Sequence, residues 1–265
     1  MKCVTRCLLV VILFLGVALE PVWGQQSNHS QPKTLKNILA SSQQMILVTT
    51  SDWNAVDGEL LRYERPSSQH PWRVVGSKIP VVVGRNGLAW GKGLHGDPST
   101  LAKPGDPVKK EGDGKAPAGI FKLSAAFGYA SLKESANVKL PYLQATPTFE
   151  CVDDVRSAYY NRLVDRDKVA QPDWNSSEQM RRDDELYRWG AVVDHNAGKP
   201  EAGAGSCIFL HIWSGAGKGT AGCTAMESAR MTELLSWLDG KKKPVLVQFP
   251  QAELVRLRES LGLIH

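Results

Sequence analysis

The pattern of apolar and polar residues is dominated by short segments with the two-residue period of β-strands. Turn residues separate these segments, and Asp57-Gly58 is a dipeptide typical of a tight hairpin. The segments that we expect to form strands are 45–53, 59–64, 73–83, 119–123, 191–195, 206–213 and 245–249. Short strands joined by turns in this way predict a mainly β domain, built as a sandwich or as a barrel.

The helical period of 3.6 residues appears in only a few places. It is clearest at 225–238, where apolar residues recur at i, i+3, i+4 and i+7. The sequence Thr-Ala-Met-Glu at 224–227 has the spacing of a capping box, so we expect Thr224 to cap this helix. We expect two more helices, an apolar-faced one at 252–261 and a polar surface helix or lid at 176–189.

The N-terminus has the layout of a cleavable secretory signal. Basic residues precede an unbroken apolar stretch at 8–19, and Gly24 follows as the small residue of a cleavage site. That stretch is shorter than the roughly 20 residues that a membrane-spanning helix needs. We therefore expect a signal peptide at 1–24, a flexible lead-in at 25–40 and one folded domain at 41–265. The domain would be exported to the periplasm or cell envelope and would not remain in the membrane after cleavage.

Composition adds little beyond this, but it excludes some partners. The net charge of +5 is spread along the chain, and its densest run, 241–243, follows a predicted helix. That run is typical of a solvated helix end, so we expect no nucleic-acid partner. The glycine-rich segment 215–220 lacks the Ser or Thr that follows the lysine of a phosphate loop, and no metal-ligand spacing is present. We expect a monomer without cofactor or metal.

The cysteines carry the strongest chemical signal. Cys3 and Cys7 would leave with the signal peptide, so that Cys151, Cys207 and Cys223 remain. An odd number of thiols in an exported protein implies a free thiol or an intermolecular bridge. The most economical arrangement is one disulfide and one free cysteine.

Local chemistry favours Cys223 as a nucleophile with His211 as its base. Alternation along 206–213 places His211 on the face opposite the aliphatic residues, and the glycine-containing loop that follows can return Cys223 to it. With Thr224 as helix cap, Cys223 would lie at a helix N-terminus, which lowers a thiol pKa and offers backbone N–H groups to an oxyanion. Gly222 permits a tight turn there. The alternative from spacing alone is a packed strand histidine and a small buried cysteine.

These residues resemble the signature of the L,D-transpeptidase (YkuD-type) family, which has a strand histidine, a glycine-containing loop and then Ser/Thr-x-Gly-Cys. The matching stretches are CIFLHIW at 207–213, GTAGCTAM at 219–226, PAGIF at 117–121 and VGRNG at 83–87. The resemblance covers roughly residues 45–250. It implies a β-sandwich with a few peripheral helices and a catalytic domain at 41–265 that acts on peptidoglycan stem peptides.

By the same resemblance, the catalytic residues are Cys223, His211, Gly222, Ile212 and Thr220. The thiolate of Cys223 would form a thioester, and the backbone carbonyl of Ile212 would orient the imidazole. The N–H groups of Gly222 and Cys223 would hold the oxyanion. The leaving group would be terminal D-Ala, and an amine or water would resolve the thioester, giving transfer or L,D-carboxypeptidase trimming.

The chain departs from the family pattern around the cysteine. Ala221 stands where the family commonly has His, no Asn or Arg follows the cysteine, and the His–Cys gap is short. We hypothesise that His195 takes the place of the missing histidine, and that Arg156 replaces the missing basic residue. Tyr159 and Trp213 are further candidates for substrate binding. A Cys151–Cys207 disulfide would leave Cys223 free, as the chemistry requires; the alternative is two buried thiols.

Two other functions remain open on the sequence. One is a hydrolase or amidase that uses the same Cys/His pair on wall peptides, because the residues around the cysteine are altered. The other is a peptidoglycan-binding module with a dormant site, although a binder has no need of an activated thiol.

Overall fold

The computed structural model describes Met1 and residues 35–263. Apart from Met1, the predicted signal peptide lies outside the described residues, as does most of the predicted lead-in. Within 35–263, no helix has both the length and the apolar character needed to cross a membrane.

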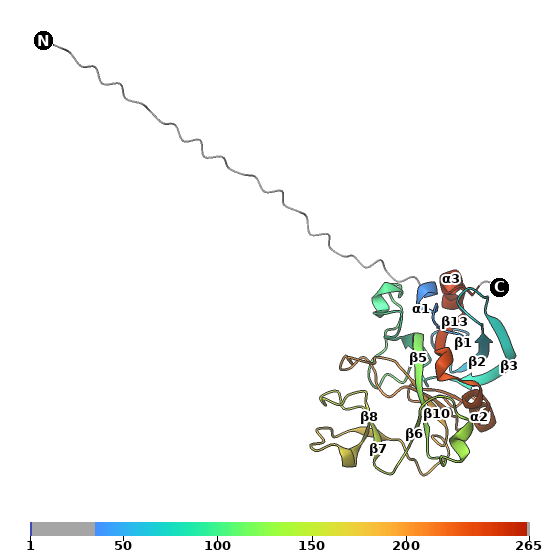
Figure 1. The fold of residues 1–265 in the computed structure, drawn as a ribbon, viewed down its shortest axis with the longest axis vertical. Helices are drawn as coiled ribbons and strands as arrows, with labels where there is room; N and C mark the ends of the chain where they lie inside the picture. The colour runs from blue at the N-terminus through green and yellow to red at the C-terminus, as the bar shows by residue number, and fades with distance from the viewer. Residues whose placement is uncertain (2–34, 264–265) are drawn as a thin grey trace. The chain divides into compact units, whose positions relative to one another are not determined.

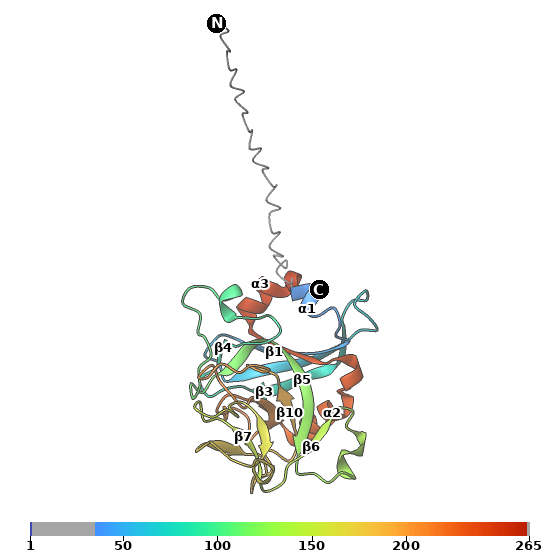
Figure 2. The ribbon, with the colours of Figure 1, turned by 60° about the vertical axis from the view of Figure 1, so that its left-hand side comes forward.

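The main sheet closes on itself like a barrel (Figures 1 and 2). Around the ring the strands are β10 (Gly190–Val193), β11 (Phe209–Ile212), β12 (Thr224–Met226), β3 (Arg73–Val82), β2 (Asp57–Glu64), β1 (Gln44–Thr50), β13 (Val245–Pro250) and β5 (Ala116–Gly128). Pairing of β5 with β10 closes the ring, and β4 (Leu88–Trp90) and β6 (Tyr142–Gln144) also pair with β5. The mainly β prediction is confirmed, whereas the sandwich implied by the resemblance is not, because the edge strands pair with each other.

Strand β5 holds this closure together. Its first half pairs with β13 and its second half pairs with β10. This one strand therefore joins the two ends of the strand order and closes the ring. Eleven of its thirteen residues are buried, which explains why the sequence pattern revealed only its central part, 119–123. A strand buried on both faces has no polar alternation to mark its ends.

The main core fills the barrel and the space beneath the helices. Its large, fully buried side chains include Trp90, Phe121 and Phe249, and the rings of Trp90 and Phe249 lie 5.4 Å apart. Packed aromatic and aliphatic side chains of this kind supply most of the stabilisation of a β domain.

Short helices surround the barrel. They are α1 (Leu35–Ile38), α2 (Ser228–Trp237) and α3 (Gln251–Leu261), with 3₁₀ turns η1 (Pro98–Thr100), η2 (Glu134–Asn137), η3 (Arg166–Lys168) and η4 (Gly240–Lys242). Helix α3 occupies the segment predicted at 252–261. Helix α2 buries Met231, Leu234 and Leu235, the stripe that predicted it.

The predicted start of α2 is wrong. Residues 224–226 form strand β12, which runs parallel to β11, and α2 begins only at Ser228. The Thr224 hydroxyl donates to Gln248 Oε1 at 2.8 Å instead of capping a helix. Sheet pairing outweighs the local capping signal because Thr224 and Met226 are both buried in it.

A second, three-stranded sheet lies at the end of the barrel away from α1 and α3 (Figures 1 and 2). Its order is β8 (Leu163–Asp165), β7 (Phe149–Val152) and β9 (Ser177–Gln179). The helix predicted at 176–189 is therefore wrong: this segment is a strand followed by turns. Glu178 pairs with Cys151 across the sheet, and Met180 and Tyr187 are buried, so tertiary contacts override its helix-forming composition.

Candidate active site

Cys223 and His211 line the same cavity, which has a volume of about 620 Å³. Trp213, Thr220 and Gly222 line it as well, so the structure brings together most of the site residues predicted on the sequence. The cavity also includes charged residues from four other segments, at positions 85, 109–111, 153 and 178–182.

The positions of both residues follow from the β11–β12 pair. His211 lies on β11 opposite Ala225 of β12, and Cys223 immediately precedes β12. Alternation along β11 is as predicted: Ile208, Leu210 and Ile212 enter the main core, and Cys207 and Phe209 pack with Cys223 in a second cluster. The parallel pairing therefore fixes the cysteine beside the histidine strand.

His211 is oriented by its own strand. Its Nδ1 lies 2.7 Å from the carbonyl oxygen of Ile212, which can only accept, so Nδ1 carries the proton and Nε2 keeps its lone pair. Burial lowers the pKa of His211 to about 4. The imidazole is thus neutral near pH 7 and has a free nitrogen that can take a proton.

The Cys223 thiol is buried, and this burial raises its pKa well above the ordinary value, with the charge of Glu178 as a further cause. Opposing this shift, the Phe209 N–H donates to Sγ at 3.3 Å, and Lys109 contributes a positive charge. The lowered pKa expected from a helix N-terminus is wrong, because Cys223 precedes a strand. The resting pair is therefore a neutral thiol and a neutral imidazole.

Thr220 shapes the turn that presents the cysteine. Its hydroxyl donates to the Cys223 carbonyl at 2.7 Å and accepts from the Gly222 N–H at 3.1 Å. A Cβ on Gly222 would stand 3.2 Å from the Lys115 carbonyl oxygen, so a larger residue is disfavoured there. Because its N–H is already bonded, Gly222 is not free to hold an oxyanion in this arrangement, which changes the role predicted for it.

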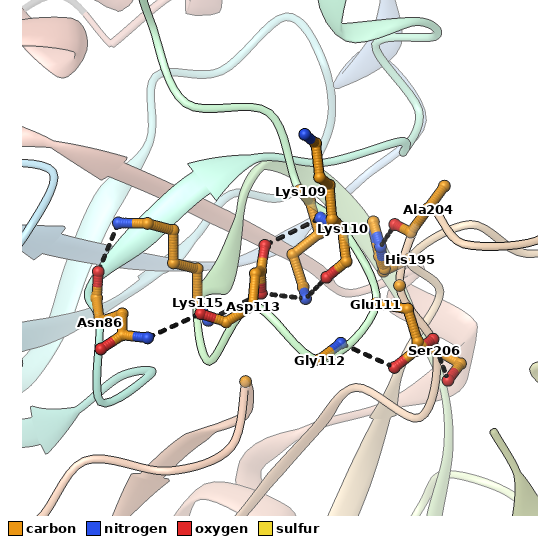
Figure 3. A network of polar contacts seen from close by, with 12 residues as sticks. Asn86, Lys109, Lys110, Glu111, Gly112, Asp113, Lys115, His195, Ala204 and Ser206 are labelled. Atoms are coloured by element: carbon orange, nitrogen blue, oxygen red, sulfur yellow. Dashed lines mark hydrogen bonds and ion pairs between the residues drawn. The ribbon is translucent and has the colours of Figure 1, made fainter.

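Lys109, Glu111 and Gly112 line the cavity. They belong to the loop at 109–115, whose polar contacts Figure 3 shows. Lys109 is buried there, and its ammonium donates to Asp113 Oδ1 at 2.6 Å and to the Lys110 carbonyl at 2.7 Å. Its Nζ lies 4.0 Å from the position that a Cβ on Gly222 would take. Two of the three ammonium protons are thus used within the loop, on the side of the cavity next to the cysteine turn.

His195 lies outside the cavity that holds Cys223. The hypothesis that it takes the place of the missing histidine is therefore not supported by its position. Its Nε2 pairs with the Ala204 carbonyl at 3.0 Å, its ring packs edge-on against Phe121, and it does not line the cavity (Figure 3). Burial lowers the pKa of His195 to about 4. The ring is a packed interior group behind the loop.

Arg156 and Tyr159 also lie outside the cavity. Arg156 is exposed and its Nε lies 3.3 Å from Asp154 Oδ1, while Tyr159 packs its ring against Trp174 at 5.3 Å. Both belong to the turn after β7, whose local hydrogen bonds hold them away from Cys223. The structure therefore does not place either next to the nucleophile.

A disulfide joins Cys151 to Cys207, and Cys223 is the free cysteine among the described residues. The bond ties β7 of the small sheet to Cys207, which lies two residues before β11. The Cys207 carbonyl also lies 3.6 Å from the Cys223 sulfur. The disulfide thus anchors the small sheet beside the cavity.

Sequence analysis missed Glu178, Tyr187 and Lys109, which all line the cavity. The first two lie in the segment 176–189, which was predicted as a polar surface helix or lid without a residue being assigned to the site. Lys109 lies in a lysine- and glycine-rich loop to which the sequence analysis assigned no role. No short-range pattern points to these residues, because separate loops bring them to the cysteine.

Comparison with known proteins agrees with this geometry. A family model described as the L,D-transpeptidase catalytic domain, YkuD, matches residues 70–247. The chain belongs to this family. The matched range includes both His211 and Cys223, and the family acts on peptidoglycan peptides. Searches of curated proteins and of solved structures gave no match.

Proposed function

We propose that this L,D-transpeptidase-type protein is an exported acyltransferase for peptidoglycan stem peptides, with Cys223 as nucleophile and His211 as base. One observation carries the proposal: the free cysteine and a histidine with an unprotonated Nε2 share a cavity of about 620 Å³. The other cysteines described are bonded to each other, so Cys223 is the thiol available for chemistry.

In the first step, His211 Nε2 takes the proton of the Cys223 thiol, and Sγ attacks the carbonyl carbon between an L-configured centre and terminal D-Ala. The bond between Nδ1 and the Ile212 carbonyl grows stronger as the imidazole gains charge. The Phe209 N–H, which already donates to Sγ, stabilises the thiolate in the same step. General-base action of this kind typically contributes about 10²–10⁴ in rate.

The oxyanion then needs donors on the cysteine side of the cavity. With the Gly222 N–H bonded to Thr220, we assign this role to the Cys223 N–H and to the buried Lys109 ammonium. Lys109 supplies positive charge close to the cysteine turn, where the family's basic residue after the cysteine is missing. Trp213, which also lines the cavity, offers an aromatic surface to the stem peptide.

Collapse of the tetrahedral intermediate expels D-Ala, whose amine takes the proton held by His211, and leaves a thioester on Cys223. An amine of a second stem then attacks the thioester carbonyl, with His211 accepting its proton, and Cys223 recovers its thiol. If water attacks instead, the product is a shortened stem. The first path crosslinks two stems, and the second trims one.

Mass spectrometry of muropeptides tests the proposal. The full chain is incubated with tetrapeptide-rich peptidoglycan beside Cys223→Ala, His211→Gln and His70→Gln. His70 is an exposed histidine of the β2–β3 loop, so its variant carries the same chemical change outside the cavity. Near-UV circular dichroism shows whether each variant keeps its tertiary packing.

We expect loss of D-Ala and new stem-to-stem dimers with the unchanged protein and with His70→Gln, and neither with Cys223→Ala. Tripeptide monomers without dimers would identify water as the acceptor. Product formation by a folded Cys223→Ala protein would refute the assignment of the nucleophile. Unaltered stems in every sample would refute the proposed substrate.

A further inference from the structure

Tyr187 contacts Glu178 and His211 and lines the same cavity as Cys223. Its hydroxyl donates to Glu178 Oε1, and its ring stands edge-on to the His211 ring, with centroids 5.0 Å apart and planes at 72°. Tyr187 is only 3% exposed, and both it and Glu178 line the cavity beside Cys223. The buried phenol therefore contacts the proposed base, His211, through its ring, and contacts Glu178, which lies in the cavity with Cys223, through its hydroxyl.

The hydroxyl has one proton to donate, so it can serve only one acceptor at a time. In the structure the proton goes to Glu178, while Tyr187 also packs with Cys223 in one buried cluster, lines the same cavity and favours the thiolate. A carboxylate and a thiolate therefore compete for the same donor. Charge-assisted hydrogen bonds are the strong ones, so the outcome changes when the sulfur becomes negative.

We propose that Tyr187 and Glu178 form a positioning pair that controls the ionisation of Cys223: the Tyr187 hydroxyl turns from Glu178 to the sulfur as the thiolate forms. Glu178 is the competing acceptor and the opposing charge. The phenol O–H bond stays intact throughout; the thiol proton goes to His211, and only the hydrogen-bond partner of Tyr187 changes. The inference rests on the proposed function because it takes Cys223 as the nucleophile.

The surroundings of Glu178 act on its ionisation in opposite directions. Burial raises the pKa of Glu178, whereas the hydrogen bond from Tyr187 and the charge of Arg182, which lies over the Tyr187 ring at 5.3 Å, favour the carboxylate. On the other side, Lys109 and the Phe209 N–H favour the thiolate. Groups from separate segments thus act on the ionisation of Cys223 in opposite directions. The Tyr187 hydroxyl is the group that can donate either to the Glu178 carboxylate or to the sulfur.

The rate at which iodoacetamide alkylates Cys223 tests this pair without any substrate. The reagent is uncharged, so the charge of Glu178 does not act on it, and peptide mass spectrometry of the full chain separates Cys223 from the other cysteines. Rates are measured between pH 7 and 9 for the unchanged protein, Glu178→Gln, and Tyr187→Phe in the Glu178→Gln background. The double variant isolates the hydroxyl, because the competing carboxylate is absent from both proteins compared.

We expect Glu178→Gln to raise the alkylation rate roughly 10-fold, and Tyr187→Phe in that background to lower it again roughly 10-fold. These factors correspond to about one pH unit in the ionisation of the sulfur, the effect of one hydrogen bond to a charged group. The matched controls are Tyr142→Phe and Glu185→Gln, whose side chains do not line the cavity. Both should leave the rate within twofold.

Equal rates in all variants, or changes of the two site variants in the same direction, would overturn the inference. Because alkylation requires no peptidoglycan, this failure is distinct from failure of the proposed function, which the muropeptide experiment detects. A protein that processes stems yet shows no opposed shift would keep its function and lose the positioning pair.

Discussion

The disulfide between Cys151 and Cys207 offers the sharpest test of how the site is supported. It joins β7 to Cys207, two residues before β11, and the small sheet that it anchors carries Glu178 into the cavity. Replacing both cysteines by alanine removes this link. The change leaves Cys223 and His211 in place, so the effect on the fold can be measured separately from the chemistry.

The magnitude follows from the chain that the bond closes. The cysteines are 56 residues apart in sequence. Closing a loop of that length removes about 14 cal/mol/K of entropy from the unfolded chain, or about 4 kcal/mol at 25 °C. We therefore expect the double variant to lose about 4 kcal/mol of unfolding free energy, a large share of the roughly 5–15 kcal/mol typical of a domain.

Urea unfolding followed by tryptophan fluorescence measures this loss, since the chain has 8 tryptophans. Cys223→Ala is the matched control: it removes a buried thiol without opening a loop and should cost only about 1 kcal/mol. Dithiothreitol should lower the unfolding free energy of the unchanged protein by about as much as the double substitution does. It should not change the unfolding free energy of the double variant.

A double variant whose unfolding free energy stays within about 1 kcal/mol of the Cys223→Ala control would refute the reasoning. It would mean that the bond does not form or that the unfolded chain is already confined. A normal stability with lost turnover would instead show that the bond acts on the site and not on the fold.

The remaining predictions concern single groups. Because the pKa of His211 is about 4, the acid limb of a pH–kcat/KM profile should lie near 4, and a limb near 6.5 would contradict a buried neutral base. Lys109→Met should lower kcat/KM on the order of 10²-fold in steady-state assays, with circular dichroism as the folding control. Thr224→Val should cost about 1–3 kcal/mol in urea unfolding because buried Gln248 loses its donor; no loss would show that the bond is unimportant. Glu150 is buried, which opposes ionisation, but its hydrogen-bond donors lower its pKa to about 2; its contribution should be complete above pH 4.5 and lost in acid unfolding as the pH falls toward 2.

Local patterns were reliable where burial and period agree. The alternation at 206–213 correctly placed His211 on the face that meets Cys223, away from Ile208 and Leu210. The apolar stripe of α2 was likewise found, because a helix packed on a sheet must show one. In β11 the aliphatic face enters the main core and the other face meets the cluster around Cys223, while α2 buries one apolar stripe. In both cases the two sides of the element differ in residue type, so the sequence alone carries the signal.

Local patterns failed where pairing partners come from far away. The capping box at 224–227 is a valid helix signal, yet β11 and β3 pair with these residues and make them a strand. The polar segment 176–189 became β9 and turns for the same reason, since β7 pairs with it. Both errors affected the predicted site. The first led us to expect a lowered pKa for Cys223, whereas burial raises it. The second left Glu178 and Tyr187 out of the predicted site.

The sequence by itself determined the mainly β class and the family signature, and it predicted that Cys223 and His211 would meet, because these depend on residue types at short spacing. The tertiary structure alone decided that the sheet closes, that His195 lies behind the loop and that Lys109, Glu178 and Tyr187 surround the sulfur. The physical reason is that ionisation depends on burial and on charges in space. Those arise from segments that are distant in the chain and meet only when the barrel and the small sheet have formed.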